Sequence, residues 1–149
     1  MKMELLSLAL LIGSLFTSPI LRAGTPEQEK AFVDKYKTAF EAGDKATLES
    51  FLYTQGAHPM ALEFYKMMQL DGAGGKVSKI ELVDLAPADA KKAEATEEGP
   101  DGQKTRMPLK PTKKLQITVE GKDGSSSSTG CLVAEKDGKF VIPVPVPAK

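Results

Sequence analysis

The sequence predicts an α+β fold in which N-terminal helices pack on a curved antiparallel β-sheet. Between residues 25 and 70, apolar side chains recur with the 3.6-residue period of helices. After the glycine-rich segment 71–75 the period changes to 2, and Asp-Gly turns at 123–124 and 137–138 join three apolar runs. The composition, 41% hydrophobic and 27% charged, is typical of a globular protein and unlike that of a disordered chain.

Residues 1–23 have the pattern of a signal peptide. Lys2 gives a positive start, an apolar run extends from Leu5 to Phe16, and a small residue, Ala23, ends the segment at the expected cleavage site. The run is shorter than the ~20 apolar residues that a membrane span needs. We therefore expect an exported protein, periplasmic or secreted, with no stable membrane anchor after cleavage. The alternative is an uncleaved N-terminal anchor. Residues 24–149 would form a single α+β roll domain.

The helical half contains clear start and stop signals. Thr25 is a helix cap with Pro26 at the first helical position, and Gln28 completes a capping box. Gly43 is expected to end this helix, and Asp44 to cap a second helix. The second helix would bury Leu48, Phe51 and Leu52. A third is expected to begin at Pro59. Its inward stripe is predicted to be formed by Ala61, Phe64, Tyr65 and Met68.

Alternating residues predict the strands. Strands are expected at 77–85, at 115–120, through the serines to Ala134, and at 140–142. Residues 86–114 are read as a long polar connection, with a short helix within 87–98 and a strand near 104–109. Pro143, Pro145 and Pro147 recur with period 2, so residues 143–149 are either an edge strand or a free polyproline-type tail.

The segment from Ala31 to Leu52, AFVDKYKTAFEAGDKATLESFL, resembles the opening of SnoaL-like domains in the nuclear-transport-factor-2-like superfamily. The order of elements, three helices followed by a curved antiparallel sheet, is also that of this cystatin-like α+β roll. The resemblance implies a sheet that wraps around the first helix. It also implies a pocket between them, used by some members for isomerase, cyclase or dehydratase chemistry and by others for binding or association. Only residues 54–58 separate the second and third helices here, whereas many members have an inserted strand or hairpin.

Several classes of function are excluded by composition and motifs. One Cys and one His cannot build a zinc site or a disulfide framework. A net charge of zero argues against nucleic acid as a partner. The Gly72–Val77 segment lacks the residues of a phosphate loop or a dinucleotide fingerprint, and no calcium-loop motif occurs. We therefore predict no metal and no cofactor.

The sequence offers few candidates for catalysis. His58 is the only imidazole, and as a general base it could work with Asp44 or Tyr53. The competing interpretation makes His58 an exposed loop residue before a helix and Asp44 a helix cap. Cys131 lies in an apolar strand and is expected to be a buried, inert thiol.

We expect a non-catalytic exported roll domain that binds a small apolar ligand or a protein partner of the cell envelope. The alternative is a small lyase or isomerase that acts in the roll pocket through His58. Homodimerisation through the open sheet face is a further prediction. The side chains expected to line the pocket are Phe32, Tyr36, Phe40, Phe64, Met68, Ile117 and Val119.

Overall fold

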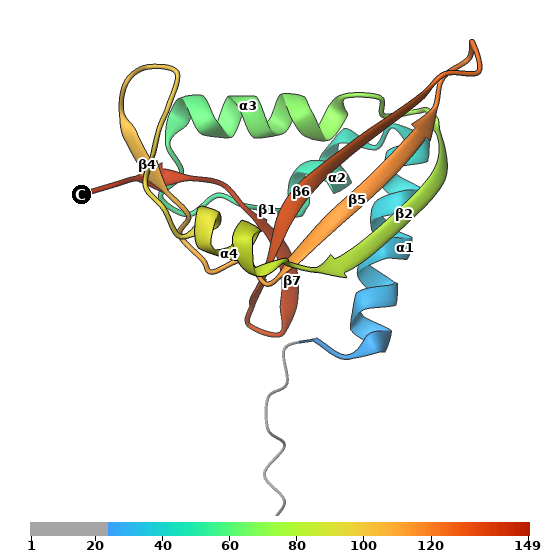
Figure 1. Cartoon of the computed structure of the whole chain (residues 1–149). Coiled ribbons are helices and arrows are strands. Elements are labelled where there is room, and N and C mark those ends of the chain that lie inside the picture. Colours follow the sequence, from blue (N-terminus) through green and yellow to red (C-terminus); the bar gives the residue numbers. More distant parts are fainter. Residues whose placement is uncertain (1–23) are drawn as a thin grey trace, which may run out of the picture.

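A computed structural model describes residues 24–149, so the predicted signal peptide lies outside the described residues. These residues form an α+β roll, in which helices pack on a curved and mainly antiparallel sheet (Figure 1). The helices are α1 (Pro26–Ala42), α2 (Lys45–Ser50), α3 (Pro59–Leu70) and α4 (Pro87–Ala93). The strands are β1 (Leu52–Tyr53), β2 (Lys76–Asp84), β3 (Glu97–Glu98), β4 (Lys104–Arg106), β5 (Lys113–Glu120), β6 (Ser126–Lys136), β7 (Lys139–Pro143) and β8 (Val146–Pro147).

Two sheets organise the strands. The larger has the order β1-β7-β6-β5-β2 and the smaller has the order β3-β4-β8. Every pairing is antiparallel except that of β1 with β7. In the β6–β7 turn both Asp137 (φ 52°) and Gly138 (φ 74°) adopt the left-handed backbone conformation, which a type I′ turn requires at both residues of a two-residue hairpin loop. The predicted meander is therefore confirmed, together with the short helix within 87–98 and a strand near 104–109.

The predicted capping signals are also confirmed. The Thr25 and Gln28 side chains each accept a hydrogen bond from the other's backbone N–H, at 3.2 and 2.8 Å. Gly43 ends α1 in the left-handed conformation (φ 62°). Asp44 caps α2 by accepting from the Thr47 backbone N–H at 3.1 Å. These contacts are local, which is why a sequence pattern of a few residues was enough to predict them.

Two of the four residues predicted for the inward stripe of α3, Phe64 and Met68, border a hollow on the outer side of the helix instead. Phe64 is 52% exposed, whereas Gln69, which the stripe omitted, is 2% exposed. The Tyr36 hydroxyl donates to Gln69 Oε1 at 2.8 Å, so the buried amide has a partner inside the protein. This hydrogen bond selects the face of α3 that packs inward and turns Phe64 outward.

The C-terminal prolines belong to an ordered, paired segment, which decides between the two alternatives. The backbone N–H of Ile142 donates to the Phe51 carbonyl at 2.8 Å, and that of Val144 donates to the Tyr53 carbonyl at 3.1 Å. Pro143 and Pro145 alternate with these two donors. Hydrogen bonding to β1 uses only the N–H groups of Ile142 and Val144, so the prolines, which have no N–H, do not interrupt it. Beyond them, β8 pairs with β4.

Large side chains fill the space between α1 and the sheet. Phe32, Tyr36, Phe40, Phe51 and Phe140 form an aromatic cluster in which neighbouring ring centres lie 5.3–6.3 Å apart. Buried aliphatic residues of the sheet complete this core: Leu115, Ile117, Val133, Ile142 and Val144. The interior next to α1 is therefore packed, and the space for a ligand lies elsewhere.

Candidate functional site

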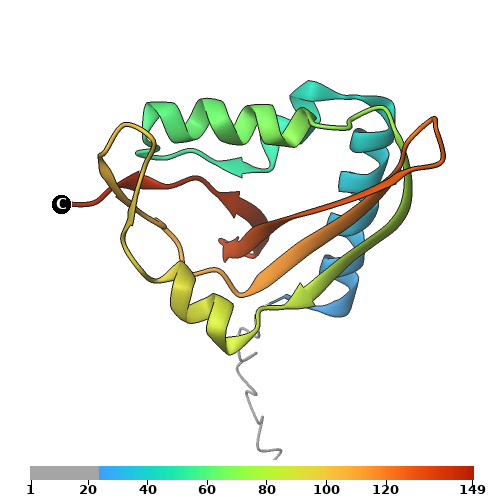
Figure 2. The same ribbon diagram turned by 45° about the horizontal axis from the view of Figure 1, so that its top comes forward.

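A pocket of about 330 Å³ lies where α3, α4, the small sheet and one end of β5–β6 meet. In Figure 2, α3 and α4 lie apart from each other, on either side of this end of the sheet. The volume is at the lower end of the range of about 300–1,000 Å³ found for small-molecule sites. The pocket is thus at the open end of the roll, beyond the packed core.

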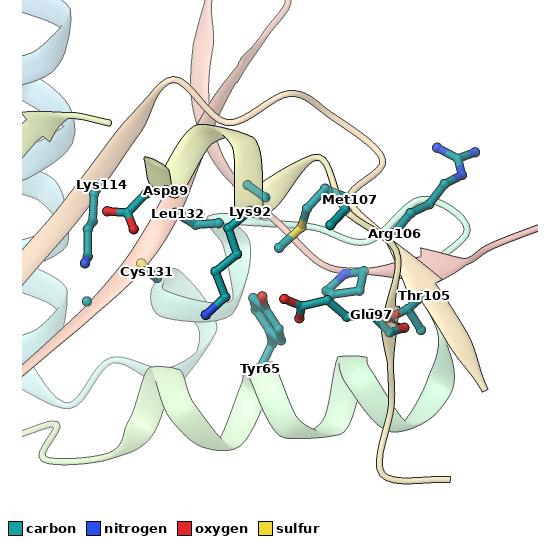
Figure 3. A pocket seen from close by; sticks show the side chains of 14 residues that line it. Tyr65, Asp89, Lys92, Glu97, Thr105, Arg106, Met107, Lys114, Cys131 and Leu132 are labelled. Carbon is teal, nitrogen blue, oxygen red and sulfur yellow. Dashed lines mark hydrogen bonds between the residues drawn. The ribbon is translucent and has the colours of Figure 1, made fainter. Parts of the chain in front are cut away.

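Tyr65 and Cys131 form the inner part of the pocket, as Figure 3 shows. Burial, together with the neighbouring Cys131 and Glu97, raises the pKa of Tyr65 to about 12. Burial also raises the pKa of the Cys131 thiol to about 12, so this group is protonated and weakly nucleophilic at neutral pH. Both groups can donate hydrogen bonds, and neither has the chemistry of an activated nucleophile. The prediction that Cys131 is an inert thiol agrees with this geometry.

Charged side chains of both signs surround the pocket. Lys92 and Asp89 come from α4, Glu97 from β3 and Lys114 from β5. In Figure 3 the Lys92 and Glu97 side chains extend toward the side of Tyr65, whereas Arg106 extends away from it. Among residues 24–149, none of Asp89, Lys92, Glu97 and Lys114 forms an ion pair within 4.0 Å.

Lys114 differs from the other charged groups because it is half-buried. Its neighbour Lys113 projects to the opposite face of the strand, where it bonds Glu29 at 2.7 Å and Asp84 at 2.6 Å. Those carboxylates raise the pKa of Lys113. The adjacent cations therefore have different environments. Lys113 ties α1 to the sheet, whereas Lys114 borders both this pocket and a hollow on the sheet face away from α1, and has no carboxylate within 4.0 Å among the described residues.

The sequence of the long connection explains how the charged rim is built. Pro87 begins α4, which places Asp89 in its first turn and Lys92 in its last. The chain then forms the β3–β4 hairpin, in which Glu97 pairs with Thr105. Pairing of β4 with β8 attaches this hairpin to the end of the chain. The segment 86–114 thus supplies most of the wall of the pocket.

A second cluster surrounds His58, which precedes the first residue of α3. The His58 side chain is 8% exposed, and its Nε2 lies 3.1 Å from both Asp101 Oδ2 and Gln103 Oε1. The His58 backbone N–H also donates to the Pro145 carbonyl at 2.9 Å. The interpretation of His58 as an exposed residue is therefore wrong. The cluster ties the start of α3 to the β3–β4 hairpin and to the C-terminal segment.

The structure does not bring together the predicted partners of His58. Asp44 caps α2, and hydrogen bonds from Thr47 hold the pKa of its carboxyl below the usual value. The Tyr53 hydroxyl donates to Gln55 Oε1 at 2.7 Å. The carboxylate beside His58 is that of Asp101, in a turn for which the sequence analysis predicted no role.

The residues predicted to line a pocket have separate locations. Phe32, Tyr36, Phe40 and Ile117 are at most 7% exposed and belong to the packed core, against which the partly buried Val119 packs. Phe64 and Met68 border a hollow on the outer side of α3. The lining found in the structure includes Tyr65, Cys131 and Lys114, and no sequence pattern groups these three residues.

Among residues 24–149, no group of three or more His, Cys, Asp or Glu side chains could hold a metal ion. In the same range, the helices are all too short or too polar to cross a membrane.

No family model and no curated protein matches the chain. Among solved structures, it is similar to one described as an NTF2-like transpeptidase from Campylobacter jejuni, with 14% identity, a TM-score of 0.42 and coverage of 76% of this chain and 94% of the other. It is also similar to one described as a calcium/calmodulin dependent protein kinase II association domain from Xanthomonas campestris, with 14% identity, a TM-score of 0.38 and coverage of 85% and 89%. At these identities, the similarities concern the fold alone.

Proposed function

We propose that the protein is an exported binding domain whose pocket takes a small amphipathic molecule with a carboxylate at its polar end. The observation that supports this most directly is Lys114, a half-buried cation that faces the pocket without an ion-pair partner among the described residues. Partial burial removes water from an ammonium group, and an anion in the pocket would offset that loss. The exposed carboxylates of Asp89 and Glu97 remain hydrated and have less to gain from a ligand cation.

The rest of the lining fits the apolar part of such a ligand. Met107, Leu132 and Pro145 provide apolar surface, and the Tyr65 hydroxyl and Lys92 provide donors near the polar end. This modifies the wholly apolar ligand that the sequence analysis expected, because charged groups surround this pocket. Export rests on the sequence of residues 1–23, and proteomic detection of a mature N-terminus at Gly24 would test it.

Catalysis by His58 is the weaker alternative. Its Nε2 already contacts Asp101 and Gln103, and these contacts attach the β3–β4 hairpin to the start of α3. A general base must reach its proton directly or through one water. His58 borders a different hollow, with Met60 and Pro147, and is not among the residues that line the pocket of Tyr65 and Cys131.

Matched probes test the proposed ligand class. Phenylacetate carries a carboxylate on a small apolar body, and phenylacetamide has nearly the same shape without the charge. We expect saturable binding of phenylacetate, followed by NMR shifts of pocket residues, and binding of the amide at least roughly tenfold weaker, which corresponds to about 1.4 kcal/mol. Equal affinity for the two probes would contradict a carboxylate site.

Two variants locate the interaction. Lys114→Gln should weaken phenylacetate binding, whereas Lys91→Gln should leave it unchanged. Lys91 is the matched control because it is an exposed lysine of α4 next to Lys92 and does not line the pocket. If both variants bind like the original protein, Lys114 does not hold the carboxylate and the proposal fails.

A further inference from the structure

The outer face of α3 carries an apolar stripe. Within residues 24–149, the large hydrophobic side chains that are strongly exposed are Met60, Phe64 and Met67, which are 47%, 52% and 62% exposed. They are spaced i, i+4 and i+7 and therefore lie on one side of the helix. In Figures 1 and 2, α3 runs along the edge of the molecule and no other element covers its outer side.

The stripe has a neighbouring depression. Phe64, Met67, Met68, Leu70 and Asp71 border an open hollow at the C-terminal end of α3. The Phe64 ring forms one wall of this hollow, so a twofold axis beside α3 would bring the exposed apolar surface of one copy against the same surface of the other. Methionine side chains are flexible and adapt readily to such a contact.

Charges along the stripe favour a second copy of this chain. Glu63 and Lys66 both lie on α3, 3.6 Å apart at the closest oxygen and nitrogen atoms. In an antiparallel pair of α3 helices, Glu63 of each copy would lie near the partner's Lys66, so opposite charges meet twice. An anionic membrane is a poor occupant, because Lys66 is the sole cation of the helix whereas Glu63 and Asp71 repel such a surface.

The face predicted from the sequence for dimerisation is less suitable. On the side of the large sheet away from α1, neighbouring strands present polar and charged residues that surround a shallow depression: Lys79, Glu81, Gln116, Thr118 and Ser128. Interfaces are depleted of charged residues in their central part and enriched in Phe and Met. The distribution of exposed apolar side chains therefore points to α3.

We infer that the protein forms a twofold homodimer through antiparallel packing of α3 against the partner's α3, with Phe64 and Met67 at its centre. Phe64 and Met67 do not line the ligand pocket, although the Phe64 ring meets the Tyr65 ring edge-on, with 6.3 Å between their centres. The dimer is therefore measured by its own readout, the monomer–dimer equilibrium.

Sedimentation equilibrium of the purified protein tests the inference. We expect a monomer–dimer equilibrium whose dissociation constant rises roughly tenfold or more in Phe64→Glu, since the introduced carboxylate would be desolvated in the interface. The matched control is Gln116→Glu, which places the same charge on the exposed sheet face and should leave the equilibrium unchanged. Both positions are exposed, and circular dichroism confirms that each variant is folded.

A charge swap adds a test of orientation. Glu63→Lys should weaken the dimer, and the double variant Glu63→Lys with Lys66→Glu should restore it. A wild-type protein that stays monomeric at concentrations of several hundred micromolar overturns the inference. Flotation of that monomer with phosphatidylcholine vesicles would not change this outcome. A dimer that persists in Phe64→Glu but dissociates in Gln116→Glu also overturns it and assigns the interface to the sheet.

Discussion

The hydrogen bond between Tyr36 and Gln69 connects α1 to α3 inside the protein, and its removal gives a sharp test of the core. The two side chains are 4% and 2% exposed, and the oxygen atoms are 2.8 Å apart. Tyr36→Phe deletes the donor and leaves the Gln69 amide oxygen buried without its partner. An unsatisfied buried polar group destabilises a protein by about 1–3 kcal/mol. We expect a decrease of that size in the free energy of unfolding.

The reciprocal variant and the double variant separate this effect from lost packing. Gln69→Leu keeps a similar volume and leaves the tyrosine hydroxyl unpaired, so it should also destabilise the fold. In the double variant Tyr36→Phe with Gln69→Leu, neither the hydroxyl nor the amide remains, so no buried polar group lacks a partner. Replacing both partners of a hydrogen bond by apolar groups can leave the free energy of unfolding nearly unchanged. Urea unfolding of the four proteins measures the coupling free energy. Simple addition of the two single effects in the double variant would refute the reasoning.

Three other features give further predictions. Burial raises the pKa of Cys131 from 9.0 to about 12, so the folded protein should react slowly with iodoacetamide at pH 8. The free energy of unfolding should also decrease as the pH rises from about 9 to about 12, because in this range the unfolded chain loses the thiol proton and the folded chain keeps it. Cys131→Ala should remove that part of the pH dependence in urea titrations. Thr25→Ala should destabilise the protein by about 1 kcal/mol by removing the cap of α1, and Thr25→Ser should retain most of the stability. His58→Ala should accelerate hydrogen exchange at the Gly99 and Gly102 amides, which bond within the β3–β4 turn, while amides of α1 exchange as before.

The helical half could be predicted from the sequence because its determinants are local. The contacts that begin α1 join Thr25 to Gln28, three residues apart, and those that begin α2 join Asp44 to Thr47. The two Asp-Gly turns likewise fix the strands on either side of them. A sequence pattern contains such contacts completely, since both partners lie within one turn of the chain.

The candidate site could not be predicted in the same way. The contacts of His58 with Asp101 and Gln103 span more than forty residues. They depend on the position of the β3–β4 hairpin, which is set by two residue pairs with β8 near the end of the chain. The inward face of α3 was misassigned for a related reason. Apolar periodicity favours Phe64 as the buried residue, but the distant Tyr36 provides a partner that makes burial of the polar Gln69 favourable.

The position of the pocket follows from the sizes of the side chains along the roll. Next to α1, aromatic rings occupy the space between helix and sheet, and a ligand finds no room there. At the open end, small residues line the walls: Ala93, Ala95, Thr105, Gly130 and Cys131. Each of them leaves volume that a leucine or phenylalanine would fill, so the polar connection 86–114 encloses a space instead of a second core. The segment that was hardest to place from the sequence is thus the one that encloses the pocket.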